Sequence, residues 1–184
     1  HQLEKEEIVS IKAGATFDDT NRDQSKILPI FEVSWIREEN VKNYEKAWVS
    51  YAESSQVLGY GAIGGSTTGR FASDPNLGRG ISKNLEFGYT LQHNDWKVSG
   101  SIFQRWDKDL VDWTFAQDST SSRFANHVDI DTLGFEFFAS RQLNKLKTDL
   151  SYAYLKKDED YKDEDVYGSF YALNYPEQRV TLAF

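Results

Sequence analysis

The stretch KNLEFGYTLQHNDWKVSGSIFQRW, residues 83–106, contains two alternating runs joined by a few polar residues. Apolar side chains recur in it with a period of two, namely Leu85, Phe87, Tyr89, Trp96, Val98 and Ile102. Charged and polar side chains share the other face, namely Glu86, Gln92, Lys97 and Arg105. A period of two is that of a β-strand, so the stretch predicts two strands with one apolar and one polar face.

The same period recurs almost from one end of the chain to the other. It predicts about eight strands, centred on residues 9–17, 31–35, 47–51, 85–91, 96–102, 133–139, 150–154 and 180–184. Several approach the roughly 9 to 11 residues with which a tilted strand spans a bilayer. No segment shows a helical period of comparable strength, so the predicted fold class is all-β with antiparallel strands.

The predicted links between these strands differ in length. They are short near 38–43, 93–95 and 141–146, and long or polar near 18–26, 57–82, 116–122 and 157–172. Outer-membrane barrels show this asymmetry, with short periplasmic turns, longer extracellular loops and walls that are apolar outside and polar inside. A soluble sandwich shows a similar alternation. The aromatic residues at the strand ends favour a transmembrane β-barrel.

In such a barrel the apolar face contacts lipid, where a charged side chain is costly near the midplane. The polar face then lines a hydrated lumen. Shared parity places six side chains toward lipid, namely Leu85, Phe87, Phe135, Phe137, Leu150 and Leu182. A slip of one residue would turn the polar side chains to lipid, so the alternation also determines the register.

The composition excludes several classes of protein. The chain has no cysteine, which rules out a disulfide framework and a thiolate metal site. Its formal net charge of -8 disfavours nucleic acid as a partner. No apolar run reaches the roughly 18 residues of a membrane-spanning helix, and no signal peptide opens the chain at His1. If the protein is exported, we expect its signal to lie upstream.

Five segments resemble successive parts of one membrane-protein family. They are VSYAESSQVLGY (49–60), DPNLGRGISKNLEFGY (74–89), DKDLVDWTF (107–115), ANHVDIDTLGFEFF (125–138) and LNYPEQRVTLAF (173–184). The second resembles the family's Asn-Pro-x-Leu, then Ser, then Glu-x-Gly signature, the fourth its Asn, then Gly-x-Glu pattern, and the last its Pro-x-x-Arg strand. In this order the segments resemble the C-terminal half of the β-barrel of TonB-dependent outer-membrane receptors.

The resemblance implies that residues 1–184 are part of a barrel of 22 strands, without its plug domain. It implies a multi-pass receptor of the bacterial outer membrane that imports a scarce nutrient such as a siderophore or cobalamin. The implied partners are membrane lipid, the nutrient, the receptor's own plug and the TonB energy-coupling system. Neither an enzymatic activity nor a cofactor is implied. Gly80 departs from the family, since many relatives carry Glu or another polar residue there.

Two alternatives remain open. The even strand count and the alternating, aromatic-terminated strand at 180–184 also suit a complete eight-stranded outer-membrane barrel with a structural or binding role. The weaker alternative is a surface hydrolase or metal site built on His127, Asp129 and Asp131, which alternate on one face. A hydrated strand end explains this trio more simply.

The link 57–82 is rich in Gly, Ser and Thr and carries three candidate ligand-binding residues, Tyr60, Arg70 and Phe71. Trp113 is expected at the outer end of the next climbing strand, on the same side of the membrane. An Arg with nearby aromatic rings can pair with an anionic ligand or stack on a flat one. The Gly-Gly pair is no phosphate cradle, because no strand-to-helix context surrounds it. The alternative is a loop that only shields the mouth.

Three further side chains are expected to face the lumen in a structural role, holding the wall or contacting the plug, namely Glu86, Glu136 and Arg179. The run KKDEDYKDEDVYG, residues 156–168, concentrates six acidic residues without the residue order of a calcium loop. It predicts a solvated loop and leaves cation binding open. No catalytic residue and no metal ligand is assigned.

Overall fold

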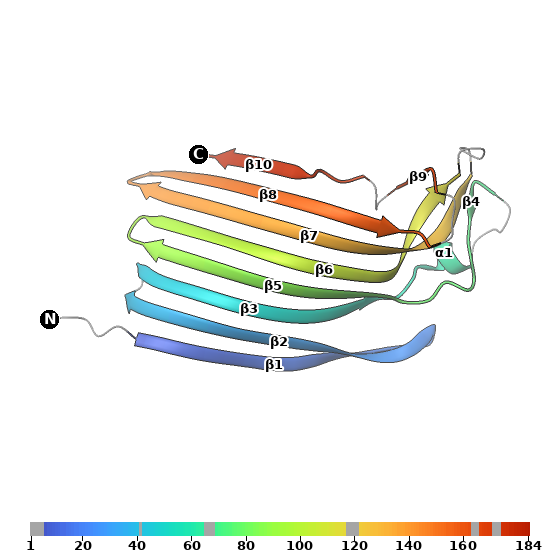
Figure 1. Ribbon diagram of the computed structural model, residues 1–184, viewed down its shortest axis with the longest axis horizontal. Coiled ribbons are helices and arrows are strands. Elements are labelled where there is room, and N and C mark those ends of the chain that lie inside the picture. Colours follow the sequence, from blue (N-terminus) through green and yellow to red (C-terminus); the bar gives the residue numbers. More distant parts are fainter. Residues whose placement is uncertain (1–5, 41, 65–68, 117–121, 163–165, 171–173) are drawn as a thin grey trace.

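The computed structural model describes residues 6–40, 42–64, 69–116, 122–162, 166–170 and 174–184, which form one curved sheet (Figure 1). Its eight long strands are β1 (Glu6–Thr20), β2 (Asp23–Asn40), β3 (Asn43–Gln56), β5 (Gly80–His93), β6 (Trp96–Phe115), β7 (Arg123–Leu143), β8 (Leu146–Asp160) and β10 (Gln178–Ala183). Between them lie the short helix α1 (Tyr60–Ile63) and the two-residue strands β4 (Phe71–Ala72) and β9 (Gly168–Ser169). The predicted all-β fold with about eight antiparallel strands is confirmed.

The long strands follow one another across the sheet in the order β1-β2-β3-β5-β6-β7-β8-β10. β1 and β10 are the two edges of the described sheet, whereas a closed eight-stranded barrel would pair them. The two short strands lie off this path, because β4 pairs in parallel with β7 and β9 pairs antiparallel with β6. No helix in the described part of the chain is long and apolar enough to cross a membrane.

Two-residue turns join β5 to β6 and β7 to β8 at one end of the sheet, at residues 94–95 and 144–145, and β2 pairs with β3 at this end as far as Asn40 and Asn43. Asn94 and Asn144 have positive φ angles of 53° and 52°, a conformation that asparagine adopts more readily than most residues. The opposite end carries the long connections 57–79 and 161–177, which confirms two of the predicted long links. We call this opposite end the outer end.

The prediction of a long or polar link at 18–26 is wrong, because most of these residues belong to β1 and β2. β1 and β2 pair as far as Thr20 and Asp23, so only residues 21 and 22 form the turn. The ladder between strands is made by backbone N–H and C=O groups, and polar side chains leave these groups free to pair. A prediction based on polar composition alone therefore assigned the paired ends of β1 and β2 to a loop.

The two strands of the β6–β7 hairpin are longer than a bilayer crossing requires, and β6 has the span 96–115 expected of the climbing strand. β6 has 20 residues and β7 has 21, against the roughly 9 to 11 of a bilayer crossing. Their pairing continues past a β-bulge between Asp107 and Leu110, where Asp109 has a positive φ of 54°. The β6–β7 hairpin thus extends well beyond the apolar part of the sheet.

The sheet has one apolar face and one polar face. A row of paired residues crosses the apolar face from β2 to β8, namely Val33, Val49, Phe87, Ile102, Phe135 and Tyr154. Five of the six side chains expected on this face are exposed, from 39% for Phe135 to 57% for Leu182, and Phe137 is half-buried there. A soluble sandwich would cover such a face with a second sheet, whereas the described residues form a single layer.

Candidate functional site at the outer end and on the polar face

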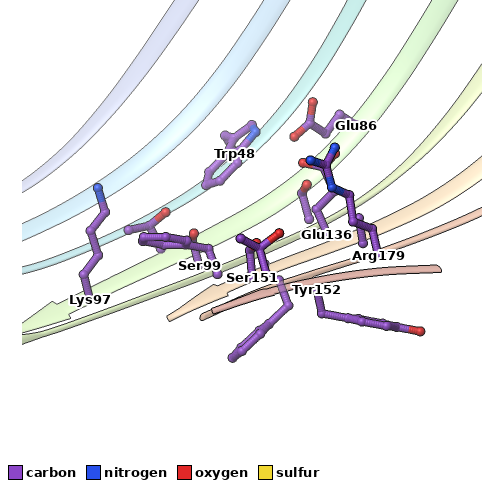
Figure 2. A pocket seen from close by; sticks show the side chains of 15 residues that line it. Trp48, Glu86, Lys97, Ser99, Glu136, Ser151, Tyr152 and Arg179 are labelled. Atoms are coloured by element: carbon purple, nitrogen blue, oxygen red, sulfur yellow. The ribbon is translucent and has the colours of Figure 1, made fainter. Parts of the chain in front are cut away.

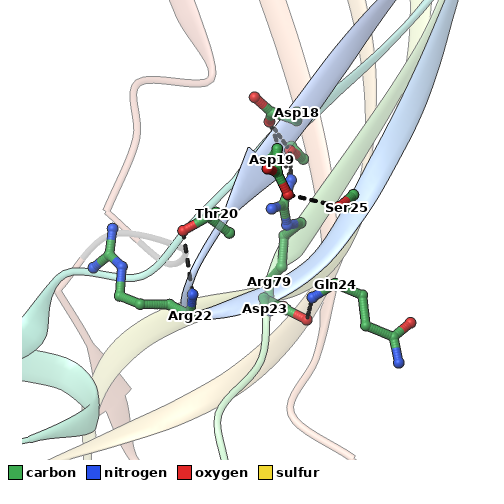
Figure 3. Close-up of polar contacts among 9 residues, drawn as sticks. Asp18, Asp19, Thr20, Arg22, Asp23, Gln24, Ser25 and Arg79 are labelled. Carbon is green, nitrogen blue, oxygen red and sulfur yellow. Dashed lines mark hydrogen bonds and ion pairs between the residues drawn. The ribbon is translucent and has the colours of Figure 1, made fainter.

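The connection 57–79 is fixed to the β1–β2 hairpin where it returns to the sheet (Figure 3). The guanidinium of Arg79, whose side chain is 2% exposed, donates to Asp18 Oδ2 at 3.1 Å and to Ser55 Oγ at 2.8 Å. The backbone N–H of Arg79 donates to Asp23 Oδ2 at 2.8 Å. Asp18 is 40% exposed, so only the guanidinium side of this pair is buried, and the loss of Asp18 would leave a buried charge without its anionic partner. This end of the connection therefore has a defined position.

Tyr60 lies at the start of α1, and 72% of its surface is exposed. The guanidinium of Arg22, in the β1–β2 turn, lies 4.9 Å from the centre of the Tyr60 ring, within the range of a cation–π contact. Arg22 also donates a hydrogen bond to the carbonyl oxygen of Leu58. Tyr60 is thus held beside the β1–β2 turn, with a cationic neighbour that the sequence did not single out.

Phe71 and Trp113 meet at the outer end. Their rings are perpendicular, with centres 5.3 Å apart, which is the edge-to-face arrangement that aromatic quadrupoles favour. β4 brings Phe71 there by pairing with Arg123 of β7, and the carbonyl oxygen of the exposed Arg70 accepts the Arg123 N–H at 2.7 Å. Three of the four candidate ligand-binding residues therefore lie together, whereas Tyr60 lies against Arg22.

A second group of rings surrounds Arg123. Its guanidinium lies 4.1 Å from the centre of the Phe115 ring and 5.7 Å from that of Phe170. Tyr167 meets Phe115 at an angle of 62°, with ring centres 6.0 Å apart. Sequence reasoning missed this group because Tyr167 and Phe170 reach β6 only through β9. The only local signal is the aromatic content on either side of β9.

On the polar face, Glu86, Glu136 and Arg179 line one hollow of about 650 Å³ together with Trp48 (Figure 2). Cross-strand pairing places these side chains on the same face of β3, β5, β7 and β10. The ring of Tyr152, which has the opposite parity in β8, points away from them in Figure 2. Two further hollows, of about 410 and 320 Å³, also border Glu136. Glu136 is therefore central to the hollowed surface.

Two residues of the trio at 127–131, His127 and Asp129, take part in contacts that hold the outer end together. His127 Nε2 accepts the backbone N–H of Gly78 at 3.3 Å, and Asp129 Oδ2 accepts a hydrogen bond from Lys108 Nζ at 3.1 Å. Among the described residues, no group of three or more His, Cys, Asp or Glu side chains is placed to hold a metal ion. These contacts tie the connection 57–79 and the bulge of β6 to β7.

The acidic run 156–168 starts in β8 and continues into the connection 161–177, and its residues 163–165 lie outside the described part of the chain. Lys162 Nζ donates to Asp109 Oδ1 at 2.8 Å. This hydrogen bond, with the nearby carboxylates, raises the pKa of Lys162 above its usual value. The run therefore carries negative charge and also binds the bulge of β6 through the hydrogen bond from Lys162 to Asp109.

Residues 7–184 match the protein family described as "TonB dependent receptor-like, beta-barrel". The chain belongs to this family. The resemblance in the five sequence segments is thereby confirmed. A search of curated proteins found no match for the receptor segment.

Among solved structures, the receptor segment is similar to one described as "Copper transporter OprC", with 19% sequence identity and a TM-score of 0.55. The match covers 73% of this chain and 21% of that chain. The chain thus spans about one-fifth of the length of that transporter. At this identity the similarity is one of fold.

The Glu-x-Gly and Gly-x-Glu motifs of this member of the TonB-dependent receptor barrel family have a packing explanation. Gly88 lies beneath Trp48 and Gly134 lies beneath Phe103, each ring coming from the paired position of the neighbouring strand. A Cβ at Gly88 would lie 2.0 Å from Trp48 Cζ2, and one at Gly134 would lie 2.1 Å from Phe103 Cζ. Only glycine leaves room for rings this close to the backbone.

Proposed function

We propose that the chain is a wall and outer-loop segment of a receptor in the bacterial outer membrane that takes up a scarce nutrient. The observation that carries this proposal is the single-layer sheet, whose apolar face is exposed and whose opposite face is polar and hollowed. A one-layer sheet of this kind is stable when lipid covers its apolar side and further strands continue it at both edges. Family membership supports the same assignment.

The polar face is the side that we assign to the lumen and to the receptor's own plug. Glu86, Glu136 and Arg179 lie there among serine and threonine hydroxyls, including those of Ser99, Ser151 and Thr181. Charged and hydroxyl groups of this kind are costly against lipid, and they form hydrogen bonds readily with a polar domain or with water. We assign these three charged residues to holding the wall and contacting the plug.

We assign ligand recognition to the outer end, at Tyr60, Arg70, Phe71 and Trp113. Phe71 is 50% exposed and Tyr60 is 72% exposed, so their rings are available to a ligand on the outer side. An exposed Arg beside two packed rings suits an anionic or flat organic molecule such as a siderophore or cobalamin. Loops on a rigid scaffold are where recognition residues collect.

The name of the structural neighbour suggests copper as a second candidate cargo. Sulfur ligands from Cys and Met select Cu(I), and the chain contains neither residue. We therefore favour an organic nutrient for the recognition site in this segment. We assign the chain to TonB-coupled transport rather than to catalysis.

The experiment is uptake by cells that express the full-length receptor. Radiolabelled ferric siderophores and cyanocobalamin are offered one at a time, with cells that lack TonB as the control. We expect TonB-dependent uptake of at least one probe, and loss of its binding when residues 61–72 are deleted while the barrel still assembles. Uptake that is independent of TonB would contradict the receptor proposal. Wild-type affinity after the deletion would contradict the assignment of recognition to this loop.

A further inference from the structure

Both long outer connections cross the tip of the β6–β7 hairpin, which comprises the described residues of 108–128 (Figure 1). The connection 57–79 leaves from the β3 side, yet its strand β4 pairs with β7, the farther strand of the hairpin. The connection 161–177 leaves from the β8 side, yet its strand β9 pairs with β6, again the farther strand. Each connection therefore reaches across the hairpin to its far edge.

The two connections contact opposite faces of the hairpin. Asp112 and Trp113 are consecutive in β6, so their side chains point to opposite sides of the sheet. The hydroxyl of Tyr161, from the second connection, donates a hydrogen bond to Asp112 Oδ2 at 3.1 Å. Phe71, from the first connection, packs edge-on against Trp113. The hairpin tip is therefore enclosed between the two connections.

Asp112 links both contacts. It is 1% exposed, and its Oδ1 accepts the backbone N–H of Trp113 at 2.7 Å. Tyr161 is 9% exposed, and it packs with Val128 and Ile130 in the small buried cluster of this end. Burial raises the pKa of the Tyr161 hydroxyl, so Tyr161 stays protonated and able to donate at neutral pH. The buried Asp112 carboxylate thus accepts one hydrogen bond from the Tyr161 side chain, in the second connection, and one from the backbone N–H of Trp113.

We propose that Asp112 is a positioning residue that couples the two outer connections across the hairpin tip, so that loosening the contact of one connection also loosens the contact of the other. The coupled connections hold Phe71 against Trp113 and so determine the shape of the recognition site. The assignment of recognition to these two rings rests on the proposed function. The coupling of the connections does not, because it is argued from strand pairing, hydrogen bonds and ring packing within the chain.

The experiment places a reporter in one connection and a substitution in the other. Ser73, next to β4, is 9% exposed, and the segment has no cysteine, so Ser73→Cys gives a single buried thiol. The full-length receptor, with any cysteines elsewhere replaced, is labelled on cells with a membrane-impermeant maleimide. Labelling is normalised to assembled receptor, which is identified by its heat-modifiable gel mobility.

Tyr161→Phe removes one hydroxyl from the other connection. Because Asp112 then loses a buried donor, we expect the labelling rate of residue 73 to rise about 5- to 30-fold. Tyr167→Phe is the matched control, since it removes a hydroxyl from an exposed ring of the same connection. We expect the control to leave labelling within about twofold of the parent, as for most surface changes.

A second comparison separates positioning by Asp112 from general loosening. Asp112→Asn by itself should raise the labelling rate, but it should add little in the Tyr161→Phe background, because both substitutions alter the same Tyr161–Asp112 hydrogen bond. The proposal would be overturned if Tyr161→Phe left the labelling rate of residue 73 unchanged. It would also be overturned if the increase in the double variant equalled the product of the increases in the two single variants. The measurement needs no ligand, so its failure leaves the transport proposal standing, and failed uptake leaves the labelling result standing.

Discussion

Alanine at Gly88 tests the close approach of a ring to the backbone on the polar face. The new Cβ would lie 2.0 Å from Trp48 Cζ2, 2.4 Å from Cε2 and 2.5 Å from Cη2. The nearest ring atom must therefore move by about 1.4 Å to reach an ordinary contact of 3.4 Å. Trp48 borders the 650 Å³ hollow, so the ring has space to move but loses its contact with the strand below.

Overpacking of this kind costs typically about 1 to 3 kcal/mol of folding free energy. We expect Gly88→Ala to lower the stability of the full-length receptor in phospholipid vesicles by this amount. The measurement is the guanidinium unfolding curve, followed by tryptophan fluorescence and by gel mobility without heating. A smaller residue at position 48 removes the obstacle, so in a Trp48→Leu background Gly88→Ala should cost less than about 0.5 kcal/mol.

Gly100→Ala is the matched control for this prediction. Gly100 lies in β6 between two described strands, and its added Cβ would have its nearest neighbour, the Glu136 carbonyl oxygen, at an ordinary 3.6 Å. Replacing glycine by alanine where the backbone permits it restricts the unfolded chain, so we expect a change between zero and about 1 kcal/mol of added stability. Equal unfolding curves for Gly88→Ala and Gly100→Ala would refute the packing argument.

Three further outcomes are expected. Phe135→Arg on the apolar face should lower the stability of the receptor in phospholipid vesicles, measured as its free energy of unfolding, by about 2 to 4 kcal/mol. An unchanged free energy of unfolding would count against contact of Phe135 with lipid. Arg79→Ala should make the connection 57–79 more sensitive to protease added to cells, with the unfolding midpoint of the wall little changed, whereas Arg79→Lys should restore part of the protection. The 184-residue chain alone should aggregate through the unpaired edges of β1 and β10, and a closed, heat-modifiable monomer from it would contradict this expectation.

The two-faced wall was predictable from the sequence because alternation is a property of adjacent residues. In any strand that contains these residues, Leu85 and Phe87 must point to one side and Glu86 to the other, whatever lies next to the strand. The same holds for the short turns, because asparagine adopts a left-handed backbone more readily than most residues, as it does at Asn94 and Asn144. The family motifs also carried information, and Gly88 shows that one of them records a packing constraint.

The ends of the strands were not predictable in the same way. Residues 18–26 read as a polar link, yet they extend the β1–β2 ladder to Thr20 and Asp23. Bonds between strands use backbone groups, which every residue except proline supplies in the same form. Side-chain polarity therefore says which face meets water or lipid, and it says little about where pairing stops.

The arrangement of the outer end was decided by tertiary structure. Tyr60, Arg70 and Phe71 are near one another in the chain, yet Tyr60 lies beside Arg22 while Phe71 lies against Trp113. β4 and β9 have two residues each, too few to show a period, and they form because the long hairpin offers backbone groups that need partners. Which connection reaches which edge depends on chain segments far apart in sequence meeting in space, and that information is absent from any local pattern.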